Sequence, residues 1–397
     1  MRAGHRPSHV LYGGAQRFHA GAPEKLSKMA ADCFREHGVE SDPGAFARVV
    51  GASDAIAMEL VTRVRAKLEA RAVERMCIDF EDGYGVRSGD EEDAHADAAG
   101  AALATIPRGS PALPSIGMRI KGIGGATHDR ALRTLERFVA ALCASGQGVP
   151  AGFTVTLPKV SGAAEVIELV DALASLEEKH ALATGAIGVE LMVETPQALY
   201  DASGRLALPA AIAAAGGRCT AVHLGAYDLT ASLGVVGPAQ TLDHLACDHA
   251  RTLMTLATAG SGVAVVDGAT NTLPLGKRDD VERGWRLHAA NVARALRAGI
   301  YEGWDLHPAQ LPARYGALFA FYLQAAKEVG ERLAAFLENA ARATRVGAAF
   351  DDAATGRGLV AFFERGLACG ALGDADLVAA GISREVLASH PFAEAMR

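Results

Sequence analysis

Two carboxylates stand at the ends of two short apolar segments, where their type and position suit metal binding. Glu194 follows the apolar run from Gly188 to Val193, and Asp228 closes the segment that begins at Val222. A continuous apolar run of this length is typical of a strand buried on both faces, as in a parallel sheet. Because hard cations such as Mg²⁺ prefer carboxylate oxygens, the pair predicts a divalent-metal site.

Short β-rich runs alternate with helical patterns along most of the chain, which indicates βα units and a parallel sheet. The predicted strands cover residues 9–13, 75–80, 117–121, 152–159, 188–194, 220–224, 262–267 and 301–307. Helical spacing of apolar residues fills segments between them, for example 163–180, 242–259 and 278–298. Eight such strands with eight helices predict an α/β fold of the TIM (β/α)₈ barrel type. A doubly wound sheet is the alternative, but it usually has fewer strands.

The chain changes character after the eighth predicted strand. A long helical pattern covers 312–339, and residues 344–358, rich in small residues and Asp, are expected to form a linker. Two helical patterns follow at 359–369 and 374–388, the second with Asp374 as its expected N-cap. We therefore expect a TIM-barrel catalytic domain over 1–342 and a small helical appendage, a tail or lid, over 343–397.

Functional groups of a TIM barrel sit at the carboxyl ends of its strands. The predicted strand ends carry a ring of charged residues: Asp79, Glu81, Asp82, Arg119, Lys121, Lys159, Glu194, Asp228, Asp267 and His307. Each of them also has a structural explanation, as a helix cap, an ion-pair partner or a buried histidine. Capping suits Glu194 least, because Thr195 is the better cap ahead of Pro196. A turn with Gly268 explains Asp267 better than chemistry does.

Composition narrows the class of partner. The net charge is −7 and no block of Lys and Arg stands out, which argues against nucleic acid or an anionic membrane and favours a small molecule. The six cysteines are scattered without a CxxC pair, so reduced thiols in the cytoplasm are the simplest interpretation. No apolar stretch reaches membrane-spanning length. The glycine loop from Gly122 to Gly125 lacks the full dinucleotide spacing, and neither GxSxG nor HExxH is present.

The ordered set of strand-end motifs resembles the HpcH/HpaI aldolase family. This family includes the citrate lyase beta subunit, malyl-CoA lyase and the class II pyruvate aldolases. The motifs are IDFEDG at 78–83, MRI at 118–120, LPKV at 157–160, VET at 193–195, GAYDLTASLG at 225–234 and HPAQ at 307–310. Each motif alone is weak, but together they follow the order of the family over residues 73–310.

The resemblance implies roles for individual residues. Glu194 and Asp228 match the two carboxylates that hold Mg²⁺, with Mn²⁺ as an alternative, and Arg119 matches the arginine that grips a substrate oxygen. The acidic motif of Asp79, Glu81 and Asp82 matches carboxylates that hold waters or contact arginine and lysine. In the pyruvate aldolases a histidine base stands at the place of Asp82, which favours the citrate lyase side. Lys159 and His307 join the catalytic candidates. The substrate-contact candidates are Arg119, Lys121, Pro196 and Gly225.

These residues suit a retro-aldol reaction, because metal and arginine charge stabilises the enolate that cleavage leaves. The resemblance thus implies a Mg²⁺-dependent carbon–carbon lyase or aldolase that acts on a small hydroxy or oxo acid or its CoA thioester. The base would be a carboxylate of the acidic motif or a metal-bound water. The family forms trimers or hexamers, and an acid of the C-terminal segment, often from a neighbouring subunit, completes the acyl-CoA lyase site. The candidates for that acid are Asp351, Asp352, Asp374 and Asp376.

Two other functions compete with the lyase. Phosphotransferases that act on phosphoenolpyruvate share the Glu194 and Asp228 motifs, but they place a cysteine after the last strand, where this chain has His307-Pro308-Ala309-Gln310. The third hypothesis is a barrel that binds a metabolite without catalysis. The intact metal pair and Arg119 argue against it.

Overall fold

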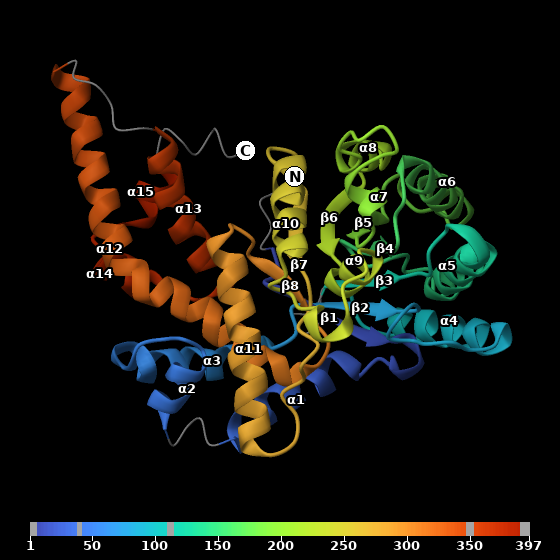
Figure 1. Ribbon diagram of the computed structural model, residues 1–397, viewed down its shortest axis with the longest axis horizontal. Helices are drawn as coiled ribbons and strands as arrows, with labels where there is room; N and C mark the ends of the chain where they lie inside the picture. The colour runs from blue at the N-terminus through green and yellow to red at the C-terminus, as the bar shows by residue number, and fades with distance from the viewer. Residues whose placement is uncertain (1–5, 38–41, 109–114, 347–352, 390–397) are drawn as a thin grey trace.

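Parallel strands form a closed barrel at the centre of the protein (Figure 1). The computed structural model describes residues 6–37, 42–108, 115–346 and 353–389. In barrel order the strands are β1 His9–Gly14, β2 Arg75–Asp79, β3 Ser115–Arg119, β4 Thr154–Leu157, β5 Gly188–Val193, β6 Cys219–Leu224, β7 Ala264–Asp267 and β8 Glu302–Asp305. The predicted TIM barrel and its eight strands are confirmed, with ends that differ by a few residues.

Strand register brings the carboxyl-end residues of neighbouring strands level with one another. β2 and β3 pair in parallel from Arg75 beside Ser115 to Asp79 beside Arg119. The five residues of β2 are all buried, as a strand between a packed barrel interior and a helical shell requires. Asp79 and Arg119 therefore meet at the end of the barrel where the strand carboxyl ends converge, which we call the mouth.

Helices surround the barrel. The connections between strands contain α1 Ala22–Glu36, α2 Pro43–Val49, α3 Ala57–Arg71, α4 Gly89–Ala104, α5 His128–Cys143, α6 Ala163–Lys179, α7 Pro196–Leu199, α8 Leu208–Ala214, α9 Ala226–Ser232, α10 Leu245–Thr258 and α11 Arg278–Arg297. The chain after β8 forms α12 Leu311–Val346, α13 Ala353–Cys369, α14 Asp374–Ala379 and α15 Arg384–Ser389. Among the described residues, no helix combines the length and the apolar character that crossing a membrane requires.

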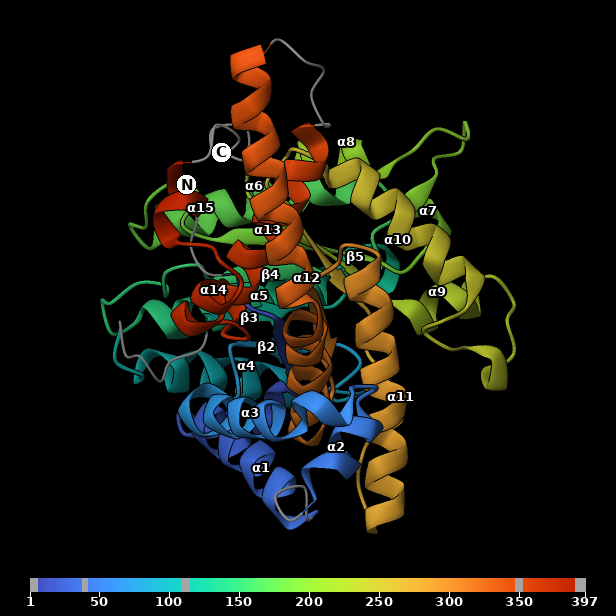
Figure 2. The ribbon, with the colours of Figure 1, turned by 90° about the vertical axis from the view of Figure 1, so that its left-hand side faces the viewer.

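The connection between β1 and β2 holds three helices instead of one. α1, α2 and α3 lie together beside α11 and the first part of α12 (Figures 1 and 2). Leu60, Val64 and Leu68 recur at helical spacing along α3 and are buried. Their burial against this layer explains why the extra helices stay attached to the barrel.

The expected linker at 344–358 is wrong at both of its ends. α12 continues to Val346 and so crosses residue 342, and α13 already begins at Ala353. The remaining residues of the expected linker, 347–352, lie outside the described residues, and Asp351 and Asp352 lie there too. Small residues misled the prediction, because alanine is the strongest helix former as well as a common linker residue.

The expected helix at 374–388 is divided in two. Gly381, at φ +72°, separates α14 from α15, and glycine adopts this left-handed conformation at little cost. The N-cap of α14 is Gly373 and not Asp374, because the Asp376 carboxylate accepts the Gly373 N–H at 2.6 Å. Asp374 is the first residue inside the helix.

The C-terminal helices dock on α3 and α12. Arg63 of α3 donates to both carboxylate oxygens of Asp376, at 2.7 and 2.9 Å. Gly330 of α12 lies so close to Ala380 that a Cβ at position 330 would stand 2.5 Å from the Ala380 Cβ. Within this chain Asp376 therefore serves docking, and Asp374 pairs with Arg384 of α15.

The barrel interior is partly charged. Glu190 of β5, 1% exposed, pairs with Arg75 of β2 and accepts a hydrogen bond from Thr156 Oγ1 at 3.0 Å. Nε2 of His223 lies 3.3 Å from the same carboxylate. Burial alone would raise the pKa of Glu190, but the charges of Arg75 and His223 outweigh it and lower the pKa to about 2.

This buried pair predicts loss of stability in acid. The pKa of Glu190 is about 2 when folded, against an ordinary value of 4.5, so its contribution is complete above about pH 4.5 and fades as pH falls toward 2. The shift corresponds to on the order of 3 kcal/mol. We expect Glu190→Gln to lower the melting temperature at neutral pH, because Arg75 loses its closest partner, and to flatten the decline between about pH 5 and pH 3. Thermal unfolding followed by circular dichroism across pH measures both effects.

The exposed Glu69 of α3 supplies the control, since Glu69→Gln should follow the parent protein at every pH. Equal pH dependence in Glu190→Gln and the parent would refute the assignment.

Candidate functional site

Arg119 is held at the mouth by a two-fold ion pair with Asp79. Its Nε and Nη2 donate to the two Asp79 carboxylate oxygens at 2.7 and 2.6 Å, and both residues are 1% exposed. The Asp79 oxygens also accept the backbone N–H groups of Glu81 at 3.0 Å and of Gly83 at 2.7 Å. A Cβ at position 83 would stand 2.7 Å from Asp79 Oδ2, so glycine makes this approach feasible. Asp79 thus fixes the guanidinium orientation.

The third nitrogen of the Arg119 guanidinium has no hydrogen-bond partner among the described residues, although it is buried. This nitrogen, Nη1, lies 3.1 Å from Glu81 Oε2 and 3.6 Å from Asp82 Oδ2. Burial alone would lower the pKa of Arg119, but the carboxylates of Asp79 and Glu81 raise it well above its usual range. The cation is therefore permanent and keeps one donor for a ligand.

Two aromatic rings flank the guanidinium from inside the barrel. The Arg119 Cζ lies 5.1 Å from the ring centroid of Tyr12 and 5.9 Å from that of Trp304. Both distances suit cation–π attraction. Sequence analysis missed both residues. The signal was present, because alternation along strand 9–13 turns Tyr12 inward just before the strand ends.

Glu194 lies buried beside Gly225 and the Lys159 backbone. Glu194 is 1% exposed, and its Oε1 accepts the Lys159 N–H at 2.6 Å. A Cβ at position 225 would stand 2.4 Å from Glu194 Oε2, so only glycine leaves room for this carboxylate. Burial raises the pKa of Glu194 to about 7, the charges of Lys159 and Arg119 oppose the rise, and Asp228 adds to it. Asp228, in the first turn of α9, keeps 43% of its side chain exposed.

Lys159 connects the acidic residues of the mouth. Its backbone has φ +53°, a conformation rare for a residue with a side chain, and such strain is frequent at functional sites. Its ammonium donates to Glu81 and lies 3.7 Å from Asp82 Oδ1 and 3.6 Å from Asp228 Oδ2. Burial lowers the pKa of Lys159, but the Glu81 hydrogen bond and the neighbouring carboxylates raise it above its usual range overall.

Seven charged candidates therefore form one connected group, which we call the mouth cluster. Its members are Asp79, Glu81, Asp82, Arg119, Lys159, Glu194 and Asp228. Gly225 belongs with them, because it borders Glu194.

The structure gives the remaining candidates other contacts. Lys121 Nζ binds Glu92 of α4 at 2.6 Å and the Phe80 carbonyl at 2.9 Å. His307 caps the short helix Pro308–Gln310, accepting the Ala309 N–H at 3.1 Å, and burial lowers its pKa. Pro196 opens α7, and Thr195 is its N-cap, as the sequence predicts. Asp267 is held by Arg251 at 2.7 Å, an ion pair instead of the expected turn role.

Two carboxylates of the mouth cluster could hold a divalent cation. Among the described residues, no group of three or more His, Cys, Asp or Glu side chains is arranged to bind a metal. Mg²⁺ differs from zinc here, because it commonly uses one or two protein carboxylates and completes its shell with water and substrate. Glu194 and Asp228 fit this requirement, with Gly225 lacking the side chain that would collide with Glu194 Oε2.

Solved structures align with this chain at low sequence identity. A citrate lyase of Burkholderia xenovorans aligns at TM-score 0.57 with 18% identity, covering 94% of this chain and 96% of that chain. CitE of Mycobacterium tuberculosis in complex with magnesium, acetoacetate and coenzyme A aligns at TM-score 0.49 with 20% identity, covering 92% and 99% of the two chains. A malate synthase of Haloferax volcanii aligns at TM-score 0.49 with 13% identity, covering 84% and 86%.

The first of these structures confirms the resemblance to citrate lyase at the level of fold. No curated protein matches the sequence. One family model covers nearly the whole sequence, residues 1–395, and the chain belongs to that family, which is described as Domain of unknown function (DUF6986).

Proposed function

We propose that this protein is a Mg²⁺-dependent carbon–carbon lyase or aldolase. It would cleave or form a small hydroxy or oxo acid, free or as a CoA thioester, through an enolate. The observation that carries the proposal is the buried Arg119 Nη1, which has no hydrogen-bond partner among the described residues and lies in a ring of carboxylates. A fixed cation with a spare donor suits a substrate carboxylate or carbonyl oxygen.

Different residues of the mouth cluster would bind the metal, bind the substrate and neutralise charge. Glu194 and Asp228 would hold Mg²⁺, which when bound would supply Lewis-acid charge that favours the enolate. Arg119 would donate from Nη1 to the substrate, while Asp79 keeps the guanidinium plane fixed. Lys159 neutralises Glu81, which reduces the repulsion that the ring of acids exerts on an anionic substrate.

Asp82 is the carboxylate best placed to move a proton. Its side chain is 57% exposed, whereas Glu81 is engaged by both Lys159 and Arg119. In the cleavage direction Asp82 would take the hydroxyl proton as the carbon–carbon bond breaks, leaving a carbonyl product and the electron pair on the enolate. Protonation of that enolate carbon completes the reaction.

The most direct test is a screen of hydroxy acids and their CoA thioesters for release of pyruvate, oxaloacetate, glyoxylate or acetyl-CoA. The proposal expects turnover with Mg²⁺ and none with a chelator. Transfer of phosphate to or from pyruvate would favour the phosphotransferase alternative instead. Binding of these compounds without turnover would favour a metabolite-binding barrel.

Removal of either metal carboxylate should weaken Mg²⁺ binding. We expect the Glu194→Gln and Asp228→Asn variants each to weaken Mg²⁺ affinity by about tenfold to a hundredfold, because each removes one anionic ligand. Isothermal titration calorimetry with MgCl₂ measures the affinity without any substrate. Asp243→Asn, a change of an exposed carboxylate outside the mouth cluster, should bind Mg²⁺ like the parent. Unaltered Mg²⁺ binding by both variants would contradict the metal assignment.

Substitution of Arg119 by lysine should impair catalysis more than folding. Lysine keeps the charge but cannot donate to Asp79 and a substrate oxygen together, so we expect kcat/KM to fall by about a hundredfold or more. Steady-state kinetics on the substrate identified by the screen provides the measurement. Arg130→Lys is the matched control, since Arg130 pairs with Asp93 of α4 outside the mouth cluster. Comparable losses in both variants would show a general structural effect instead.

A further inference from the structure

A second cavity lies at the barrel end opposite the mouth. Its volume is about 490 Å³, within the range of small-molecule sites. It borders the residues that precede or open strands, including Ser8, Val263 and Glu302. Its outer walls come from the end of α10, from α12 at Tyr322 and from α13 at Arg365. We call it the base cavity, and it shares no residue with the mouth cluster.

Glu302 lines the base cavity, and one of its carboxyl oxygens is buried without a hydrogen bond among the described residues. The residue is 7% exposed, and its Oε1 has no hydrogen-bond partner among the described residues. The nearest cationic nitrogen, Arg75 Nη1, is 3.9 Å away. Burial raises the pKa of Glu302 to about 7, although Arg75 and Arg6 oppose the rise. A buried carboxyl without a partner is costly, so a ligand that supplies a hydrogen bond there would gain free energy.

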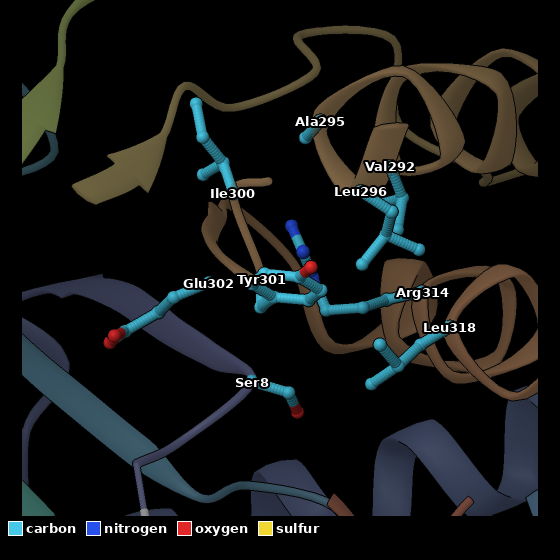
Figure 3. A pocket seen from close by; sticks show the side chains of 9 residues that line it. All are labelled: Ser8, Val292, Ala295, Leu296, Ile300, Tyr301, Glu302, Arg314 and Leu318. Carbon is cyan, nitrogen blue, oxygen red and sulfur yellow. The ribbon is translucent and has the colours of Figure 1, made fainter. Parts of the chain in front are cut away.

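A small neighbouring pocket shows how this carboxyl is directed. The pocket has a volume of about 10 Å³ and shares Ser8, Tyr301 and Glu302 with the base cavity. Figure 3 shows the Glu302 carboxylate turned away from the apolar side chains of Val292 and Leu296. The carboxyl thus does not point into the packed layer between barrel and helices.

The entrance of the base cavity carries guanidinium groups. Arg365 of α13 lies over the Tyr301 ring, with its Cζ 4.1 Å from the ring centroid. It makes no hydrogen bond or ion pair with any other residue of the described ranges. Arg6 borders the same cavity and donates to the Gly262 carbonyl. Stacking on the Tyr301 ring orients the Arg365 guanidinium group and leaves its N–H groups available as donors. Such a group suits a carboxylate or phosphate.

We propose that the base cavity binds a small organic anion, a carboxylate or a phosphate monoester, that also carries a hydroxyl group. Arg365 would take the anionic group, and the Glu302 carboxyl would hydrogen-bond the hydroxyl group. Since α13 forms one wall and strands form the other, such a ligand would also strengthen the attachment of α13 to the barrel. This site is independent of the proposed lyase chemistry.

Binding can be tested without any turnover. The full chain is titrated by calorimetry with malate and, separately, with glycerol 3-phosphate, both in the presence of EDTA. We expect at least one of the two to bind and to raise the melting temperature. Preference for malate or for glycerol 3-phosphate identifies the anionic group. No binding of either compound would overturn the proposal.

Substitutions of the lining residues test whether the anion binds in the base cavity. Arg365→Gln should weaken the affinity by about tenfold, the value of a lost charge-assisted hydrogen bond, whereas the exposed Arg357→Gln on the same helix should not. Glu302→Gln, which retains the shape of the side chain, should weaken binding as well. Arg119→Lys should bind like the parent, because the mouth plays no part. Parent-like affinity in both Arg365→Gln and Glu302→Gln, or loss in Arg119→Lys alone, would refute the assignment to the base cavity.

Discussion

The ion pair between Asp79 and Arg119 is the constraint on which the site depends. A guanidinium that is 1% exposed must be neutralised, and Asp79 does so with both oxygens because β2 and β3 are in register at their carboxyl ends. The same carboxylate also receives the backbone N–H of Gly83, which fixes the acidic loop. That loop brings Glu81 and Asp82 within 3.1 and 3.6 Å of the free Nη1. One pair of residues thereby orders both the buried guanidinium and the acids around it.

Beneath this pair, the barrel interior carries a chain of polar side chains from the mouth toward the base. The Tyr12 ring lies against Arg119, and its hydroxyl group lies 3.3 Å from His223 Nδ1. His223 in turn approaches Glu190, which pairs with Arg75. Isolated charges in such an interior would be costly, but a paired series satisfies most of its members. The series ends at Glu302 near the base, whose Oε1 lies 3.9 Å from Arg75 Nη1 and makes no hydrogen bond among the described residues.

The sequence predicted the barrel because buried parallel strands consist of continuous apolar runs, which are easy to recognise. The charged residues at the ends of these runs predicted most of the mouth cluster. It could not predict contacts that depend on side-chain direction. Lys121 stands two residues after Arg119, yet it turns to Glu92 of α4. His307 follows β8 like a catalytic group, yet its ring accepts a backbone N–H of its own turn. The C-terminal helices were predicted, but their bounds were wrong for another reason: alanine and glycine occur in helices and linkers alike, so only tertiary docking decides between them.

The two ends of the barrel use buried carboxyl groups differently. At the mouth, every carboxylate of the cluster has a cation within 4 Å or a backbone donor, and Glu194 is held by the Lys159 N–H while Gly225 permits its close approach. These contacts hold the carboxylates in fixed positions before a ligand arrives, although acids outnumber cations in the cluster. At the base, Glu302 Oε1 makes no hydrogen bond among the described residues and has Arg75 Nη1 only at 3.9 Å, while Arg365 of α13 lines the same cavity. A hydroxylated anion that binds both Glu302 and Arg365 would supply the hydrogen bond that Glu302 lacks.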